Sequence, residues 1–406
     1  MIISLIGNNG SGKTTLSKKI LEYFLKNKVS VIFIGEFDYF LLKYIKKLLG
    51  NKKLERSKNL IKDENKITLT KRILPYIIWF DLILEHLYFK IFCRNKIVIK
   101  DRYAYDFLMT WKELKVSSKI IECLYKIFPK PDLLFYVYTK PEIAFSRRDA
   151  QKEKEKNYDL NFYKYKTKIY LDFCRMKNIL LIDNNGTIDK AYSEIIYCIE
   201  LREKILKTKT IAISGLDGSG KTTTIDNFSE LLNKLNIKHK VAHFYYNYIP
   251  LKILSFLKRK KSQDEKEKYQ NSISNEIESV QKGKSKIWAL CVIIDSYIQY
   301  ILVRLFSFNK LIIFDRFFYD YLISFDFLKV KYNKKLLLKI FPKVDRSFLQ
   351  IADYEILHKR KPEHTIEFFE QCYEKYNNLA EKQNMIILDS TDNDEDKILK
   401  ILLDKI

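Results

Sequence analysis

The sequence predicts an α/β fold of three layers, α/β/α, in which a mostly parallel sheet is covered by helices on both faces, and it predicts this fold twice in tandem. Three observations support this. Two glycine-rich loops of the pattern G-x-x-x-x-G-K-T begin at Gly7 and at Gly215. Longer stretches repeat at an offset of about 210 residues, which indicates two copies of one domain. Within each copy, short apolar runs alternate with amphipathic segments, as strands alternate with helices in parallel sheets.

Each glycine-rich loop follows an apolar run and precedes a helix-like segment, which is the context of a phosphate-binding loop (P-loop). The glycines allow backbone N–H groups to converge on phosphate oxygens, the lysine reaches the β- and γ-phosphates, and the first threonine binds Mg²⁺. The sequence therefore predicts a P-loop NTPase fold with two nucleotide sites. The expected nucleotide-binding residues are Gly7, Gly10, Ser11, Gly12, Lys13, Thr14 and Thr15 in the first copy, and Gly215, Gly218, Ser219, Gly220, Lys221, Thr222 and Thr223 in the second.

The repeat extends far beyond the loops. NKIVIKDRYAYDFL (95–108) matches NKLIIFDRFFYDYL (309–322), and KIFPKPD (126–132) matches KIFPKVD (339–345). We therefore expect two domains, 1–205 and 206–406. The connector 206–210 is short and lacks proline and glycine, so we expect the two halves to pack against each other. The strands expected after the first strand of each copy are 30–35, 97–100, 133–138 and 179–183, then 241–246, 311–314, 346–351 and 385–389. The polar tracts 51–66 and 258–286 are interpreted as solvated excursions.

The composition of the chain indicates which partners and which cellular compartment to expect. The 406 residues carry a formal charge of +24, which favours anionic partners such as nucleotides, nucleic acid or an acidic membrane, although a solvated lysine surface explains it equally well. The six cysteines lie far apart and the chain begins directly in a strand, so we expect a reduced, cytoplasmic protein. The most apolar segment, 287–308, is interrupted by Asp295, Gln299 and Arg304 and is interpreted as a buried or amphipathic helix.

An Asp-Arg pair ends an apolar run in each copy, Asp101-Arg102 and Asp315-Arg316. Such an aspartate can hold Mg²⁺ directly or through water, so the predicted metal residues are Thr14, Asp101, Thr222 and Asp315. ATPase motors place a glutamate after this aspartate to activate water. An arginine there suits a second phosphate better than hydrolysis, with a structural ion pair as the alternative.

Basic residues also follow the fourth strand of each copy, where Arg147 and Arg360 lie at equal distances beyond the FPK-x-D element. Guanidinium groups on a closing lid can neutralise charge on a phosphoryl group in transfer. A basic helix face is the alternative. Together the predicted catalytic residues are Lys13, Asp101, Arg102, Arg147, Lys221, Asp315, Arg316 and Arg360.

The order of these elements resembles the thymidylate kinase family of P-loop nucleoside monophosphate kinases, over nearly the whole of each copy. GLDGSGKTTT, beginning at Gly215, is the most specific piece. The resemblance implies ATP and Mg²⁺ as cofactors and transfer of the γ-phosphoryl group to a monophosphate acceptor. It implies that Lys13 and Lys221 bind the transferred phosphoryl group, that Arg102 and Arg316 bind the acceptor phosphate, and that Asp217 binds a sugar hydroxyl of the acceptor.

The sequence departs from the family pattern around the acceptor. The first loop has Asn9 in place of an aspartate, and the arginine expected after the helix aspartate is Leu82 in one copy and Ser296 in the other. Glu36, in the first copy, is the obvious base for an alcohol acceptor and is predicted to contact substrate. Two further hypotheses stay open: a kinase of a lipid or sugar alcohol, and a nucleotide-dependent switch acting on nucleic acid or membrane.

Overall fold

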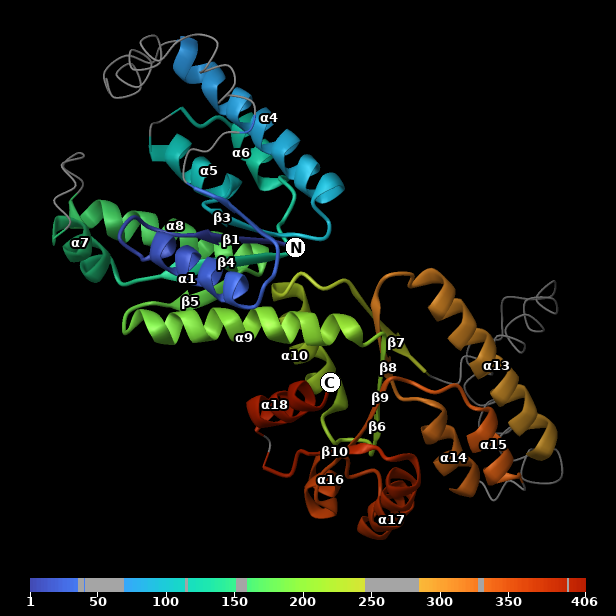
Figure 1. The fold of residues 1–406 in the computed structure, drawn as a ribbon. Coiled ribbons are helices and arrows are strands. Elements are labelled where there is room, and N and C mark those ends of the chain that lie inside the picture. Colours follow the sequence, from blue (N-terminus) through green and yellow to red (C-terminus); the bar gives the residue numbers. More distant parts are fainter. Residues whose placement is uncertain are drawn as a thin grey trace, which may run out of the picture. The chain divides into compact units, whose positions relative to one another are not determined.

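The computed structural model describes residues 1–35, 40, 69–113, 116–150, 159–244, 285–327, 332–392 and 394–406. The chain divides into two compact units (Figure 1). Unit 1 contains Met1–Glu200 with Lys234–Asn236, and unit 2 contains Leu201–Asn233 with Ile237–Ile406. Glu36, the tract 51–66 and nearly all of the tract 258–286 lie outside the described residues, so the expectations placed on them stay predictions.

Unit 1 is built on a five-stranded parallel sheet with the strand order β2-β3-β1-β4-β5. Every residue of β1 and of β3 is buried, as expected for central strands covered on both faces. The strands are β1 (Ile2–Ile6), β2 (Val31–Ile34), β3 (Ile97–Asp101), β4 (Leu133–Tyr138) and β5 (Leu180–Asp183).

Seven helices are described in the part of the chain that forms unit 1 and its junction. Helix α1 packs on β1, β2 and β3, and α8 packs on β4. A buried core of Ile, Leu and aromatic side chains lies between the sheet and helices α4, α5, α6 and α8. The helices are α1 (Lys13–Lys26), α4 (Leu69–Phe92), α5 (Ala104–Glu113), α6 (Lys119–Lys126), α7 (Pro141–Ala150), α8 (Leu160–Lys177) and α9 (Ile188–Lys207).

Unit 2 repeats the arrangement, with the strand order β7-β8-β6-β9-β10. Its strands are β6 (Thr210–Gly215), β7 (His239–His243), β8 (Leu311–Asp315), β9 (Arg346–Ile351) and β10 (Ile386–Asp389). Its helices are α10 (Lys221–Lys234), α13 (Ser285–Phe306), α14 (Phe318–Phe327), α15 (Lys334–Ile340), α16 (Tyr354–Arg360), α17 (Ile366–Gln383) and α18 (Glu395–Lys405). In chain order both sheets read second-third-first-fourth-fifth, so the predicted duplicated α/β fold is confirmed.

The repeated FPK-x-D aspartates stabilise the start of each central strand. Asp132 accepts a hydrogen bond from the backbone N–H of Ile2 (2.7 Å). Asp345 accepts from the backbone N–H groups of Lys209 (2.7 Å) and Thr210 (2.9 Å). These carboxylates accept hydrogen bonds from backbone N–H groups at the strand ends opposite the P-loops. We therefore attribute the repeated aspartates to folding of the strands and not to the reaction.

Two local expectations differ from the structure. β7 begins at His239 and not at 241, because it pairs with β8 from His239 opposite Leu311; β7 is an edge strand, where polar residues such as Lys240 are tolerated. The connector is also shorter than expected, since α9 continues to Lys207 and β6 begins at Thr210.

Within the described residues, no helix is both long and apolar enough to span a bilayer.

Candidate active site

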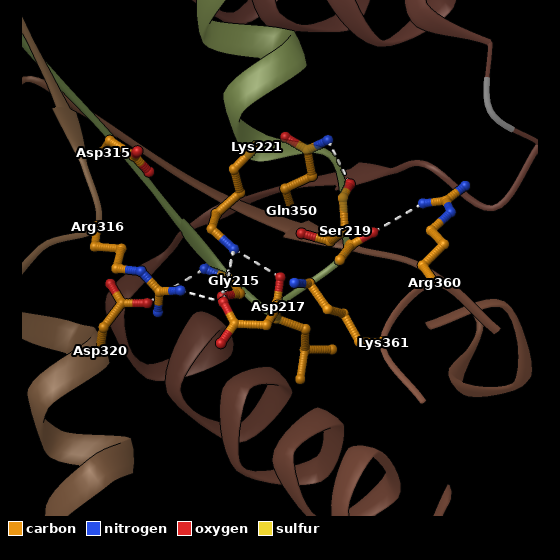
Figure 2. A network of polar contacts seen from close by, with 12 residues as sticks. Gly215, Asp217, Ser219, Lys221, Asp315, Arg316, Asp320, Gln350, Arg360 and Lys361 are labelled. Atoms are coloured by element: carbon orange, nitrogen blue, oxygen red, sulfur yellow. Dashed lines mark hydrogen bonds and ion pairs between the residues drawn. The ribbon is translucent and has the colours of Figure 1, made fainter. Parts of the chain in front are cut away.

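The P-loops lie where the central strands β1 and β6 pass into helices, and Figure 2 shows the loop of unit 2. Their glycines have positive φ angles, among them Gly10 (77°), Gly12 (90°), Gly218 (82°) and Gly220 (86°). L side chains rarely adopt this conformation. A Cβ atom on Gly10 would also lie 2.4 Å from the carbonyl oxygen of Ala144. The loop conformation therefore depends on glycine at these positions.

Gly10→Ala is expected to weaken nucleotide binding at the first loop at least tenfold, about 1.4 kcal/mol. The added methyl group forces the loop away from Ala144 and strains the backbone by about 1–3 kcal/mol. Isothermal titration with Mg-ATP in a Lys221→Ala background, which weakens the second loop, measures this affinity. Gly186→Ala is the matched control because no atom lies within 4 Å of its added Cβ. Equal affinities of the two variants would contradict the geometric argument.

The P-loop lysines are buried and directed into their own loops. The Lys13 Nζ donates to the carbonyl oxygens of Gly7 and Asn8, both at 2.8 Å, and Lys221 makes the same two contacts in unit 2 at 3.0 and 2.6 Å. Burial, and then the charge of the neighbouring arginine, lower the pKa of each lysine to about 8. An anionic phosphate in the loop would favour the charged form of the lysine.

The arginine that follows the third strand of each copy reaches the third residue of the P-loop. The Arg102 Nη2 donates to Asn9 Oδ1 (3.3 Å), and Arg316 forms a close ion pair with Asp217 Oδ1, drawn in Figure 2. Burial raises the pKa of Asp217, but Arg316 and Lys221 outweigh it and the pKa is lowered. The two copies therefore make the same contact with different charge: Asn9 is neutral, whereas Asp217 offsets the guanidinium charge.

Both arginines also have positive φ angles, 106° at Arg102 and 67° at Arg316. Such a conformation costs a residue other than glycine about 1–3 kcal/mol and is concentrated at functional sites. The same unfavourable geometry in both copies aims each guanidinium group at its P-loop.

The predicted metal aspartates end β3 and β8, beside the loops. Asp101 is 4% exposed, and its Oδ1 is buried without a hydrogen-bond partner among the described residues. Such an oxygen suits a cation or a metal-bound water. Asp315 differs, because its Oδ2 lies 2.8 Å from the His243 Nδ1. Sequence reasoning did not identify His243, which lies one strand away at the end of β7 and opposite Asp315 in the sheet.

A second aspartate, missed by sequence reasoning, connects the P-loop to the Asp-Arg turn. Asp320 accepts hydrogen bonds from the backbone N–H of Gly215 (3.4 Å), the backbone N–H of Phe317 (2.8 Å) and the Tyr376 hydroxyl (2.7 Å). In unit 1 Asp106 accepts from the equivalent donors of Gly7 (3.2 Å), Tyr103 (3.3 Å) and Tyr170 (2.5 Å). Each aspartate lies four residues after the arginine inside the repeated stretches 95–108 and 309–322, so the repetition was the available signal.

The two predicted lid arginines lie near their P-loops, Arg360 through a direct hydrogen bond to the loop and Arg147 through Asn184. The Arg360 Nη1 donates to the Gly218 carbonyl oxygen (2.9 Å) and approaches the loop in Figure 2. The Arg147 Nη1 donates to the Asn184 carbonyl oxygen (3.1 Å), and the Asn184 side chain in turn donates to the Ser11 carbonyl oxygen (2.7 Å). In both units the fourth strand is thus followed by a guanidinium group beside the P-loop.

The remaining predicted loop residues comprise buried serines and exposed threonines. The Ser11 and Ser219 hydroxyls are buried and have no hydrogen-bond partner among the described residues, while the Ser219 carbonyl oxygen is held by Gln350 (2.8 Å) and Ser390 (2.7 Å). The threonines at the start of α1 and α10 have exposed side chains: Thr14, Thr15, Thr222 and Thr223. Leu82 and Ser296 are buried and offer no cationic contact to an acceptor phosphate.

Known proteins similar to this chain include thymidylate kinases. Residues 6–195 match the family model described as thymidylate kinase. A probable thymidylate kinase of Sulfurisphaera tokodaii is 28% identical over 202 residues, 48% of this chain and 94% of that protein. The thymidylate kinase of Leptospira borgpetersenii is 28% identical over 201 residues, 48% of this chain and 89% of that protein. A probable thymidylate kinase of Sulfolobus acidocaldarius is 27% identical over 202 residues, 48% of this chain and 93% of that protein.

Proposed function

We propose that both units bind Mg-ATP and transfer its γ-phosphoryl group to a nucleoside monophosphate, a proposal supported by the match of residues 6–195 to the thymidylate kinase family model and by the similar relatives. The observation that carries the proposal is the pairing, in each unit, of a buried P-loop lysine with an arginine aimed at the same loop. Membership of the second unit in the same family is part of the proposal, and it is supported by the strand order that the two units share.

The residues suit Mg-ATP. Lys13 and Lys221 would leave the loop carbonyl oxygens for the β- and γ-phosphates, and the loop N–H groups would receive the remaining phosphate oxygens. Thr14 and Asp101 in unit 1, and Thr222 and Asp315 in unit 2, would hold Mg²⁺ directly or through water. The metal, when bound, neutralises charge that develops on the phosphate oxygens.

The arginines would bind the acceptor phosphate and hold it in line with the γ-phosphorus. Arg102 and Arg316 lie beside their loops, and Arg147 and Arg360 would add charge from the lid side. Because the acceptor is already an anion, transfer needs positioning and charge stabilisation more than a general base. In unit 2, Asp217 would turn from Arg316 to a hydroxyl group of the acceptor sugar.

The test is an assay of ADP release by the full chain over the common nucleoside monophosphates, with free nucleosides and other alcohols as comparison acceptors. Lys13→Ala and Lys221→Ala variants assign each activity to a unit. Transfer to at least one monophosphate supports the proposal. Phosphorylation of alcohols alone would reject the monophosphate acceptor, and ATP binding without transfer to any small acceptor would favour a switch.

Asp217→Asn is expected to lower kcat/KM for a nucleoside monophosphate at least tenfold, about 1.4 kcal/mol of transition-state binding. The change removes the carboxylate that positions Arg316 and would accept the acceptor hydroxyl. The affinity for ATP should stay within about a factor of three. Steady-state kinetics and titration measure both, and Asp226→Asn, an exposed site on α10, is the control. An unchanged kcat/KM would mean that Asp217 only stabilises the loop.

A further inference from the structure

The predicted metal aspartate of unit 2 has a histidine neighbour that unit 1 lacks. The His243 Nδ1 lies 2.8 Å from the Asp315 Oδ2, because β7 and β8 pair in parallel with these two residues opposite each other. In unit 1 the strands β2 and β3 pair in the same way, and their register continued by one residue brings Gly35 to Asp101. Glycine has no side chain to offer, so the imidazole is a feature of unit 2 alone.

Both side chains of this pair are accessible to a ligand. The side chain of His243 is 61% exposed and that of Asp315 is 13% exposed. Among the described residues, neither side chain makes a hydrogen bond besides the one between them. Asp315 ends β8 beside the P-loop, as Figure 2 shows. This end of the sheet therefore offers one imidazole nitrogen and one carboxylate oxygen to a cation at the nucleotide site.

The separation of the two atoms suits neighbouring ligands of one metal ion. In octahedral coordination with bond lengths of about 2.1 Å, adjacent ligand atoms lie about 3 Å apart, and the separation here is 2.8 Å. A neutral imidazole binds a metal through the nitrogen that carries no proton. Binding through the Nδ1 of His243 therefore leaves the proton on its Nε2.

An imidazole ligand changes which metal ion a site prefers. Mg²⁺ takes oxygen ligands and keeps several of its waters. Imidazole suits the later first-row transition ions, whose affinity for nitrogen and oxygen sites rises from Mn²⁺ to Cu²⁺. Gly35 supplies no such ligand beside Asp101, so the two units offer different sets of metal-binding groups.

We propose that His243 and Asp315 together ligate the metal ion of unit 2, and that the imidazole makes this unit bind a divalent transition ion such as Co²⁺ more tightly, relative to Mg²⁺, than unit 1 does. The inference rests on the proposed metal-nucleotide site and names the residue that sets its metal preference. Asp315 contributes to the binding of either ion, whereas His243 contributes to the choice between them.

The first test detects the nitrogen ligand directly. Proton NMR of the full chain with Co²⁺ and inorganic tripolyphosphate, which brings phosphate oxygens but no nitrogen, should show an exchangeable imidazole N–H resonance that the metal shifts far outside its ordinary range. His243→Gln should abolish this resonance. His239→Gln, the matched change at the other end of β7, should keep it. A shifted imidazole resonance that persists in His243→Gln, or its absence from the wild-type chain, would overturn the proposal.

Metal affinity gives a second readout. In calorimetric titrations with tripolyphosphate present, His243→Gln should weaken Co²⁺ binding at one site at least about tenfold and leave the Mg²⁺ affinity within about a factor of three. Asp315→Asn should weaken the binding of both ions. Because the His243 side chain is exposed, circular dichroism should stay unchanged. Equal losses for the two ions in His243→Gln would mean that the histidine only orients Asp315, and unchanged Co²⁺ binding would remove its role altogether; either result overturns the proposal.

Neither measurement depends on phosphoryl transfer, so the inference and the proposed function can fail separately. A chain that binds Co²⁺ through His243 but phosphorylates no monophosphate would support the metal pair and reject the proposed reaction. A chain that transfers a phosphoryl group with Mg²⁺ but gives no His243-dependent Co²⁺ signal would support the reaction and overturn the metal pair.

Discussion

Lys221→Ala is expected to lower kcat for phosphoryl transfer at the second unit by about 10²- to 10³-fold, the effect of removing one pre-positioned charge donor. The lysine is buried in the loop with its Nζ on the carbonyl oxygens of Gly215 and Leu216, and alanine would supply no charge to replace it there. Lys13→Ala should act in the same way on the first unit. Initial-rate kinetics on a panel of acceptors measures both losses.

The two lysine variants should not behave alike. Asn9 and Asp217 give Arg102 and Arg316 different local charge, so we expect each variant to reduce transfer to different acceptors, or to one acceptor by very different factors. Lys18→Ala, an exposed lysine on α1, should leave every rate unchanged. Equal losses for all acceptors would indicate two redundant catalytic sites.

Asp320→Ala is expected to lower the unfolding free energy of unit 2 by about 3 kcal/mol, because each buried donor left without an acceptor costs about 1–3 kcal/mol. The donors are the Gly215 and Phe317 backbone N–H groups and the Tyr376 hydroxyl. Denaturant unfolding followed by hydrogen exchange of peptides from each unit makes the measurement, since a chain of two units does not unfold in one step.

Two control variants distinguish the loss of the three Asp320 hydrogen bonds from the general effect of a substitution. Tyr376→Phe removes a single hydrogen bond and should cost about 1 kcal/mol. Asp404→Ala changes an exposed aspartate and should change stability by less than about 0.5 kcal/mol. If Asp320→Ala were as mild as Asp404→Ala, the three contacts would not stabilise the loop.

Much of the fold could be predicted from the sequence because its signals are local. A G-x-x-x-x-G-K-T loop between an apolar run and a helix pattern fixes strand, loop and helix within a few residues, and the repeat transfers every assignment from one copy to the other. The α/β alternation predicts a parallel sheet covered by helices, whereas the order of its strands comes from the structure. β7 was misplaced by two residues because edge strands tolerate polar residues, which hide their apolar pattern.

The candidate site could be predicted only in part. Lys13, Arg102 and their counterparts lie within short motifs and were identified. The role of Asp106 depends on Tyr170, 64 residues away, and that of Asp315 on His243, 72 residues away. Contacts between distant segments are set by strand order and packing, which single-sequence patterns do not specify. The placement of Glu36 stays a prediction.

Helix α9 joins the two halves of the chain and determines what a division of the chain into its two units would cost. The division between the units falls between Glu200 and Leu201, inside α9. On one side of it, Tyr23 donates to Glu200 (2.8 Å); on the other, Lys204 donates to the carbonyl oxygens of Leu403 (3.0 Å) and Asp404 (2.9 Å). A single helix therefore contributes hydrogen-bonded groups to both units. A cut of the chain between Glu200 and Leu201 would keep each of these hydrogen bonds within one product, but it would divide α9 and leave each product with a new helix end to satisfy.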